Sequence, residues 1–322
     1  MNLEEITARL EQLHTVSGQL DVSEDQRREM VGLVADYANQ FINGLSTVRG
    51  YNEKQPGSLA IGNGGIPLEL LLNAYQSEVA ETGINAASGT HLGYIPGGGI
   101  FISALADFIT AVTNPYAGVF YASPGAVTIE NEVINWLKSV FSFPADAVGN
   151  LTSGGSVSML IAFNAARDKY GIKNEKVRQS VVYLSELVHH SAQKALRILG
   201  LEDVIIRYVP LDDRHRINTA VLASLVEEDK THGLLPFLVV ATAGTTDTGA
   251  VDPLNAIADI TEKHGLWLHV DGAYGGFFIL TSKKELFKGI ERADSIIVDP
   301  HKSLFLPYGL GAVLIRDKDA VL

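Results

Sequence analysis

Five short segments of the chain carry residues that could do chemistry, and each one ends or follows a run of apolar or β-branched residues. Between them they offer a glycine-rich turn, imidazoles, hydroxyls, a carboxylate and an amine. In chain order the segments are Thr152–Ser156, Ser185–Ser191, Ala243–Gly249, His269–Tyr274 and Asp299–Ser303.

The segment Thr152–Ser156 is rich in glycine and precedes a predicted helix. Backbone N–H groups at Gly155 and at the helix start can face an anion, and the Ser156 hydroxyl could add a donor. A tight strand-to-helix turn explains the same residues about equally well. The segment lacks the Gly-Lys-Ser/Thr ending of a P-loop and the glycine spacing of a dinucleotide site.

An acid and an amine end two other segments. Asp271 closes the buried run Leu266–Val270, and a buried carboxylate is costly unless it has a partner. A helix cap is the structural alternative, whereas a protonated heterocycle would suit a ligand role. Lys302 follows the run Ser295–Val298, where a partly desolvated amine would be a nucleophile toward aldehydes. A surface lysine in a turn explains Lys302 alone more simply.

Two histidines and a threonine complete the candidate groups. His189 and His190 are adjacent, so on a helix they point to different faces, and no metal site is predicted. One imidazole could instead stack flat on an aromatic ligand. Thr246 either offers a hydroxyl to a ring substituent or belongs to a polar turn.

The set is more specific than any member. Pyridoxal 5'-phosphate (PLP) requires an anion site, a group against its ring, a carboxylate for its ring nitrogen and a lysine for its aldehyde. The sequence supplies these groups in order after successive predicted strands. It therefore predicts a PLP site.

Short apolar runs that alternate with helical stretches must position these groups. This pattern predicts a mostly parallel sheet covered on both faces, with ligands at the carboxyl ends of its strands. The predicted strands are Val148–Thr152, Val181–Leu184, Val204–Val209, Phe237–Thr242, Leu266–Val270, Ser295–Val298 and Gly311–Ile315. The helices predicted between them are Val157–Tyr170, Ser191–Leu199, Thr219–Glu228 and Asn255–His264.

Further helices are predicted before the first strand. Ser23 and Gln26 fit a capping box at the start of one of them. We predict an N-terminal helical segment over residues 1–85 and a PLP-binding large domain over residues 86–322. The predicted helices are Leu3–Thr15, Glu24–Asn43, Pro67–Glu81, Ile100–Val112 and Thr128–Phe141.

Composition excludes several classes of function. The 322 residues carry a formal net charge of -12, which disfavours binding to nucleic acid or to an anionic membrane. The absence of cysteine excludes disulfides, thiolate zinc sites and cysteine nucleophiles. No apolar run is long enough to span a bilayer, and the charged amphipathic N-terminus is not a secretory signal. We expect a cytoplasmic protein.

The combined motifs resemble the group II PLP-dependent amino-acid decarboxylases, which include aromatic-L-amino-acid, histidine, tyrosine and glutamate decarboxylases. The resemblance covers nearly the whole chain. It implies the aspartate-aminotransferase-like fold (fold type I), an α/β large domain with a seven-stranded, mostly parallel sheet. It also implies decarboxylation of an L-amino acid and a homodimer with active sites near its interface. The matching stretches are Thr152–Ser156, Val188–Ser191, Ala243–Thr246, His269–Tyr274 and Asp299–Lys302.

The resemblance also implies residue roles. Lys302 forms the Schiff base with PLP, Asp271 pairs with the pyridine nitrogen, and His189 stacks on the ring and aids catalysis. Tyr94 and Gly97 lie in the segment Tyr94-Ile95-Pro96-Gly97, which resembles one that lines the substrate pocket. The remaining implied contacts are Gly155, Ser156 and His301 at the phosphate, Ala273 under the ring and Thr246 near Asp271 and the cofactor.

The chain departs from the family pattern in several places. Asp299 stands where many members have Asn, and an acid beside a phosphate is unfavourable, so Asp299 is expected to point away or act otherwise. Ser303 replaces a common Trp, and the run 97–99 of three glycines replaces bulkier residues, which weakens the case for an aromatic substrate. Family members continue into a mobile loop with a catalytic Tyr and a small C-terminal domain. Neither follows Leu322, so we expect this sequence to be part of a longer chain.

Two other functions fit the same residues. One is a different fold type I reaction, by an aminotransferase, a lyase or an aldolase, although a cysteine desulfurase is excluded because it needs a cysteine. The other is an inactive cofactor-binding or structural subunit. Aromatic, acidic and basic amino acids all fit as the small-molecule substrate.

Overall fold

The structure is a computed structural model, and it describes residues 2–57, 60, 62, 64–91, 93 and 98–321. Contacts between residues divide the chain into two compact units, Met1–Gly93 and Tyr94–Leu322. The predicted boundary between residues 85 and 86 lies inside the first of these units.

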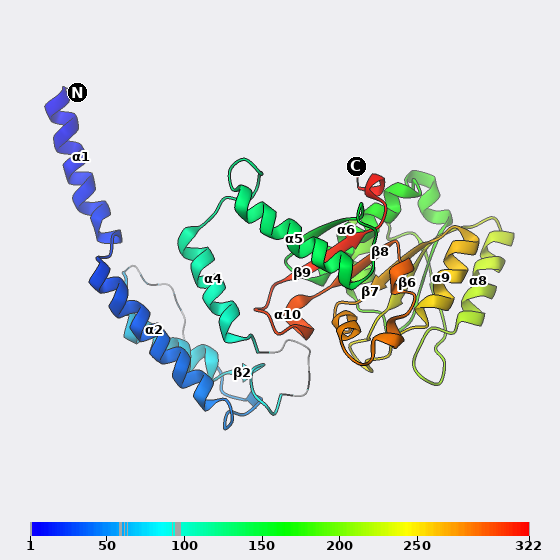
Figure 1. Ribbon diagram of the computed structural model, residues 1–322, viewed down its shortest axis with the longest axis horizontal. Coiled ribbons are helices and arrows are strands. Elements are labelled where there is room, and N and C mark those ends of the chain that lie inside the picture. Colours follow the sequence, from blue (N-terminus) through cyan, green and yellow to red (C-terminus); the bar gives the residue numbers. More distant parts are fainter. Residues whose placement is uncertain are drawn as a thin grey trace. The chain divides into compact units, whose positions relative to one another are not determined.

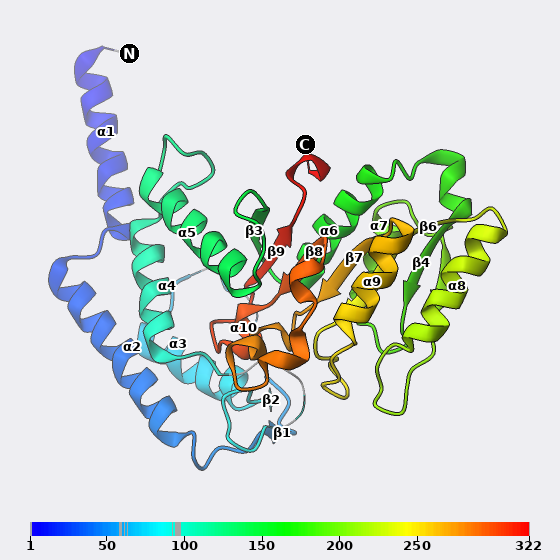
Figure 2. The same ribbon diagram turned by 45° about the vertical axis from the view of Figure 1, so that its right-hand side comes forward.

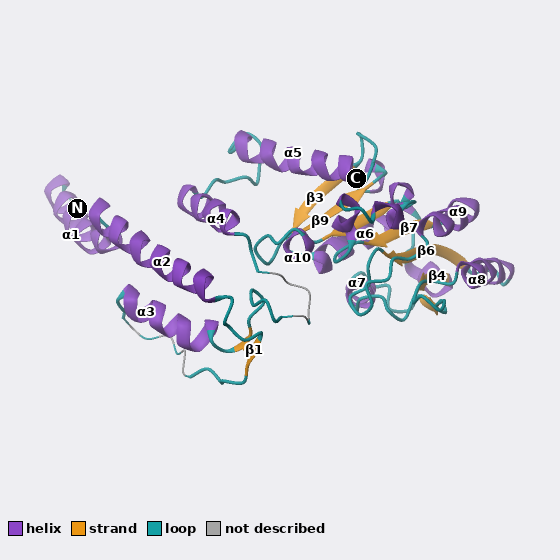
Figure 3. Ribbon diagram, turned by 60° about the horizontal axis from the view of Figure 1, so that its bottom comes forward, coloured by secondary structure: helices purple, strands orange, loops and turns teal. Residues whose placement is uncertain are grey.

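The first unit consists of helices and one pair of very short strands, as the colouring of Figure 3 shows. Ser23 caps the second helix: its hydroxyl accepts the Gln26 N–H at 3.2 Å, and the Gln26 side chain accepts the Ser23 N–H at 2.8 Å. The predicted capping box is therefore confirmed. The elements are α1 (Leu3–Ser17), α2 (Glu24–Gly44), the antiparallel strands β1 (Tyr51–Asn52) and β2 (Gly83–Ile84), and α3 (Leu68–Tyr75), which continues as a π-helix over Gln76–Ala80.

The second unit contains a sheet and several helices, some of which cover the faces of the sheet (Figure 1). One helix begins earlier than predicted, at Pro124 rather than Thr128, because proline is tolerated in a first turn that needs no N–H donor. The helices are α4 (Phe101–Thr113), α5 (Pro124–Val140), α6 (Gly155–Lys169), α7 (Ser191–Ile198), α8 (Thr219–Thr231), α9 (Leu254–His264) and α10 (Pro300–Ser303).

All seven predicted strands of the large sheet are confirmed, with bounds that differ by two residues at most. Their order across the sheet is β3-β9-β8-β7-β6-β4-β5, and β9 is the one antiparallel strand of the seven. The sheet is therefore mostly parallel, as predicted. The strands are β3 (Val148–Thr152), β4 (Ser180–Leu184), β5 (Ile205–Tyr208), β6 (Leu235–Thr242), β7 (Trp267–Asp271), β8 (Ser295–Val298) and β9 (Gly311–Ile315).

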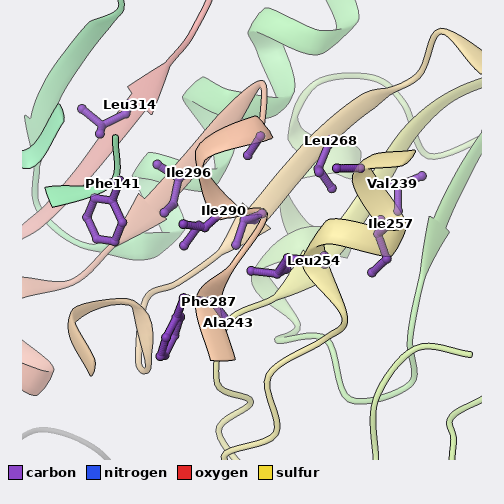
Figure 4. Close-up of a cluster of buried hydrophobic side chains, with 14 of the residues drawn as sticks. Phe141, Val239, Ala243, Leu254, Ile257, Leu268, Phe287, Ile290, Ile296 and Leu314 are labelled. Carbon is purple, nitrogen blue, oxygen red and sulfur yellow. The ribbon is translucent and has the colours of Figure 1, made fainter. Parts of the chain in front are cut away.

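Two hydrophobic clusters lie on opposite faces of this sheet, because successive side chains of a strand point to opposite faces. Residues of α5, α8 and α9 pack against one face, and residues of α6 and α7 pack against the other. Figure 2 shows α8 and α9 in front of the sheet, and Figure 4 shows part of their cluster, including Val239, Leu268, Ile257 and Ile296. Burial on both faces explains why the strands read as continuous apolar runs.

No helix within the described ranges is both long enough and apolar enough to cross a membrane.

Candidate active site

The carboxyl ends of five strands share one edge of the sheet in the second unit. β3, β4, β6, β7 and β8 run in the same direction, because β9 is antiparallel to both of its neighbours, β3 and β8. Each of the five segments singled out in the sequence ends or follows one of these strands. This edge is where ligands bind in parallel sheets.

The glycine-rich turn after β3 leads directly into α6. Gly154 has a φ of 136°, which residues with a side chain rarely adopt, and Gly155 is the first residue of the helix. The Thr152 hydroxyl accepts the Gly154 N–H at 3.3 Å and lies 2.7 Å from Ser158 Oγ. Ser156 is exposed in the first helical turn. The N-terminus of α6 is thus presented at the sheet edge, where an anion is favoured.

His301 lies beside this turn and is buried. Its Nδ1 is 2.5 Å from the carbonyl oxygen of Leu310, which can only accept, so Nδ1 carries the proton. Its ring also meets the Tyr308 ring edge to face, with 4.8 Å between centroids. A Cβ placed on Gly154 would lie 3.9 Å from His301 Cε1, so the imidazole is adjacent to the turn.

Asp271, the last residue of β7, is only 5% exposed. Its Oδ1 accepts the Ala273 N–H at 3.0 Å, and its Oδ2 has no hydrogen-bond partner among the described residues. Burial raises the pKa of Asp271 and Asp299 adds to the rise, whereas the Ala273 N–H and Lys302 lower it. A cation that donated to Oδ2 would offset the cost of burying the charge.

The strand that carries Asp271 is held by a buried chain of polar side chains that was not predicted from the sequence. Trp267 Nε1 donates to Ser295 Oγ at 2.8 Å, and the same oxygen lies 2.8 Å from His269 Nδ1. Burial lowers the pKa of His269 to about 3, so its ring is neutral at ordinary pH. These contacts join β7 to β8, and the alternation of Trp267, His269 and Asp271 in an apolar run was the signal for them.

Lys302 lies in α10, directly after β8, and its side chain is 21% exposed. Its Nζ is 2.9 Å from Asp299 Oδ2. The Lys302 charge contributes to lowering the pKa of both Asp271 and His189, so all three groups lie within one electrostatic environment. Asp299 was expected to point away from the phosphate or to act otherwise, and the structure pairs it with Lys302. A spacing of three residues in a helical turn is the signal for such a pair.

Two further contacts join the segments that follow β3, β7 and β8. A Cβ placed on Gly155 would lie 3.4 Å from the Ala273 Cβ, so the glycine-rich turn packs against the segment after β7. Ser303 Oγ donates to the carbonyl oxygen of Tyr274, so the segment after β8 also contacts the segment after β7. The structure therefore brings Gly155, Asp271, Ala273, His301 and Lys302 together.

His189 follows β4 and is exposed. Its Nδ1 accepts the Ser191 N–H at 3.2 Å and lies 2.8 Å from Ser191 Oγ, so the neutral ring carries its proton on Nε2. Partial burial of the ring lowers the pKa of His189, and His190 and Lys302 lower it further. The neutral imidazole is favoured near neutral pH.

Three of the predicted contacts are not placed against this cluster. Thr246 is exposed and makes no hydrogen bond to Asp271 among the described residues, so its proximity stays a prediction. Tyr94 and Gly97 lie outside the described residues. The described chain resumes at Gly98, and the Ile100 N–H donates at 2.9 Å to the carbonyl oxygen of Phe305, three residues after Lys302.

No cluster of three or more potential metal ligands occurs in the part of the chain that the structure describes. The adjacent rings of His189 and His190 have centroids 4.1 Å apart and are tilted by 40°.

A family profile described as the pyridoxal-dependent decarboxylase conserved domain matches residues 68–322. The chain is 42% identical over 227 residues to the aromatic-L-amino-acid decarboxylase of Bacillus atrophaeus, a match that covers 70% of this chain and 47% of that protein. It is 38% identical over 230 residues to an acidic amino acid decarboxylase of Bos taurus, which covers 69% of this chain and 44% of that protein. The chain thus spans about half the length of the curated relatives it matches.

A solved structure has the same fold. The crystal structure of the glutamate decarboxylase domain of diaminobutyrate-pyruvate transaminase and L-2,4-diaminobutyrate decarboxylase from Vibrio parahaemolyticus superimposes with a TM-score of 0.84. It is 28% identical, and the match covers 93% of this chain and 69% of that chain. The fold expected from the sequence is confirmed.

Proposed function

Because the chain belongs to the pyridoxal-dependent decarboxylase family, we propose that it uses PLP to remove the carboxylate of an L-amino acid as CO₂ and leave the amine. One observation carries this proposal. The Lys302 amine and the Asp271 carboxyl follow or end neighbouring strands, close enough for the Lys302 charge to act on the pKa of Asp271. When bound, PLP supplies an aldehyde for an amino group and a protonated ring that takes up the electrons left behind by CO₂.

Lys302 and Asp271 hold the two ends of the reactive part of the cofactor in this proposal. Lys302 would provide the amine that holds the cofactor aldehyde, and its partial exposure leaves that amine accessible. Asp271 would hold the protonated ring nitrogen, because its Oδ2 has no partner among the described residues and is able to accept. Such a charge-assisted bond would keep the ring nitrogen protonated and would compensate the burial of Asp271.

His189 is proposed to stack against the cofactor ring. Its lowered pKa favours the neutral form, and an uncharged imidazole can lie on a cationic ring without electrostatic repulsion. The hydrogen bond from the Ser191 N–H to Nδ1 holds the ring orientation and leaves the Nε2 proton available to donate.

The phosphate is proposed to bind at the start of α6. Gly155 and Ser156 lie in the first turn of that helix, and His301 lies beside the turn. Ala273, which packs near Gly155, is small enough to lie under a flat ring, and Thr246 is proposed to approach it from the segment after β6. These assignments use the donors that a phosphate requires.

The substrate class is open within the amino acids. The relatives described above are named for aromatic and for acidic amino acids. We propose Tyr94 and Gly97 as substrate contacts, and the bond from Ile100 to Phe305 supports a path of the chain near Lys302. An aromatic amino acid is the first substrate to test.

The chain is further proposed to act as a homodimer. Helix α4 is strongly apolar, yet none of its residues is buried within this chain. Exposed apolar patches of this kind mark interaction surfaces, and a second copy would cover one. Sedimentation of the purified chain should give a dimer, and a monomer would contradict the assignment. The exposed apolar residues of the helix are Phe101, Ile102, Leu105, Phe108, Ile109 and Val112.

A cytoplasmic location is proposed as well, without nucleic-acid or membrane partners. The absence of cysteine is compatible with a reducing compartment, and the charge of -12 disfavours polyanions.

The experiment that tests the function combines a spectrum with product analysis. The purified chain with PLP should gain a visible absorbance, and Lys302→Ala should lose it, whereas Lys173→Ala, at an exposed lysine elsewhere, should keep it. A panel of L-amino acids should release CO₂ and amine. Formation of keto acids instead would indicate an aminotransferase, and bound cofactor without CO₂ from any amino acid would refute decarboxylation by this chain.

A further inference from the structure

Asp299 is a buried acid that lies inside the proposed cofactor site. It follows β8, is only 2% exposed, and its Oδ2 forms an ion pair with Lys302 Nζ at 2.9 Å. Asp299 is the residue directly before α10 and Lys302 lies within this short helix, so the two side chains are three positions apart and can meet. Asp299 therefore contacts the amine on which the proposed chemistry depends.

The second oxygen of Asp299 is unsatisfied. Oδ1 is inaccessible and has no hydrogen-bond partner among the described residues. A buried acceptor without a donor is costly, and such groups in native proteins often mark a functional site.

The carboxylate is directed at the start of α6. A Cβ placed on Gly155 would lie 3.0 Å from Oδ2 and 3.2 Å from Oδ1 of Asp299, so the carboxylate packs tightly against this glycine. The first N–H groups of α6 attract anions, and the cofactor phosphate is proposed to bind there. The Asp299 carboxylate thus lies beside the place where the cofactor phosphate is proposed to bind.

The charge of Asp299 reaches beyond its own ion pair. It contributes to raising the pKa of Asp271, after burial, and to raising that of His189 against the larger effect of burial. The Lys302 ammonium offsets part of this negative charge. An amine that has condensed with an aldehyde is no longer a free ammonium ion, so its interaction with Asp299 would differ.

We propose that Asp299 is a resident anion of the cofactor site, which pairs with Lys302 and opposes the phosphate, so that the chain releases PLP more readily than it would with an amide at this position. The proposal rests on the proposed function. With weaker binding, the fraction of protein molecules that carry PLP varies with the free PLP concentration. The proposal also assigns Asp299 as a positioning residue for Lys302, with an effect on affinity that depends on its charge.

The test compares two ligands that differ only in the phosphate. PLP and pyridoxal share the ring and the aldehyde, so the ratio of the Kd for pyridoxal to the Kd for PLP isolates the contribution of the phosphate. Both constants are measured by equilibrium dialysis in a phosphate-free buffer. Asp299→Asn keeps the shape of the side chain and removes its charge.

Asp299→Asn should raise this ratio about ten-fold, equal to about 1.4 kcal/mol, because the like charge is gone. Asp203→Asn is the matched control: it removes the same charge from an exposed pair with Arg178 and should leave the ratio unchanged. Asp299→Ser, with a side chain suited to the start of a helix, should raise the ratio as well and covers the case in which the first variant fails to fold.

Two outcomes would overturn the inference. A ratio that stays constant or falls in both folded variants would mean that Asp299 does not oppose the phosphate. If neither the wild-type chain nor the folded Asp299 variants bind PLP more tightly than pyridoxal, the proposed phosphate site itself is wrong, and the function proposed above fails with it. If the wild-type chain binds PLP more tightly than pyridoxal and the ratio is unchanged in the variants, the proposed function stands and only the role of Asp299 is refuted.

Discussion

The second unit buries acids in two different ways. On the β4–β5 side of the sheet, Asp229 of α8 is 2% exposed, and both of its oxygens are hydrogen-bonded. Arg207 donates to both of them and the Tyr183 hydroxyl donates to Oδ2 at 2.8 Å. At the carboxyl ends of β7 and β8, Asp271 and Asp299 are buried about as deeply, but each keeps an oxygen with no partner within the described ranges.

The pKa values follow this difference. Burial alone would raise the pKa of Asp229, but the hydrogen bonds and charge of Arg207 and the Tyr183 hydroxyl outweigh it, and the net shift is downward. For Asp271 burial prevails, and the pKa is raised. The fold itself supplies the partners that favour the charged form of Asp229, whereas the open acceptor of Asp271 leaves a position for a donor from a ligand.

The largest effect that separates the two regions is expected from Asp271→Asn. The amide can still accept the Ala273 N–H, but it cannot carry the charge that holds a proton on the ring nitrogen. We expect CO₂ release to fall about a hundred- to a thousand-fold and the Kd for PLP to rise about ten-fold, while the unfolding midpoint without cofactor stays unchanged or rises. Full turnover in this variant would show that Asp271 is a structural acid like Asp229.

The reciprocal change, Asp229→Asn, should lower the stability of the fold without changing the affinity for PLP. It leaves the Arg207 charge without its carboxylate, although Arg207 is 38% exposed and water can replace part of the interaction. We expect a loss of about 3 kcal/mol in the free energy of unfolding in urea, with an unchanged Kd for PLP. Asp203→Asn, at an exposed pair with Arg178, should cause no measurable loss. A change in PLP affinity in the Asp229 variant would remove the distinction between the two regions.

The sequence predicted the elements of the fold better than their arrangement. The apolar runs predict all seven strands, because burial on both faces leaves a continuous β-branched pattern. The same pattern does not specify which strands pair, so it gives neither the place of β9 between β3 and β8 nor its antiparallel direction.

For the candidate site, the sequence likewise predicted which segments take part but not how their side chains contact one another. The segments that contain Gly155, Asp271 and Lys302 were identified because ligand-binding groups follow the ends of parallel strands. The ion pair of Asp299 with Lys302 was not predicted, because the spacing of three residues permits it only when the turn that follows the strand is helical. The contact of Asp299 with Gly155 joins segments that are far apart in the sequence, so no local sequence pattern predicts it.

A third buried acid sharpens the comparison, because it combines full pairing with a raised pKa. Asp252 accepts the N–H groups of Ile217 and Thr242, each at 2.7 Å, yet burial raises its pKa to about 6. Its donors are neutral, unlike the Arg207 guanidinium at Asp229. The charged Arg207 contributes to lowering the pKa of Asp229, whereas the neutral N–H groups at Asp252 do not outweigh the effect of its burial.

The consequence is a pH dependence of stability that is opposite in sign for the two acids. The folded pKa of Asp252 lies above its unfolded value, so its contribution is fully present below about pH 4 and is lost as the pH rises toward 6. Asp229, with a lowered pKa, contributes stability above its unfolded value and loses it as the pH falls. Asp252→Asn cannot titrate, so its stability relative to the wild type should improve by about 2 kcal/mol between pH 4 and pH 6. Urea unfolding at four pH values across this range measures the difference, and a difference that stays constant or runs the other way would mean that the backbone N–H groups hold Asp252 ionised as firmly as Arg207 holds Asp229.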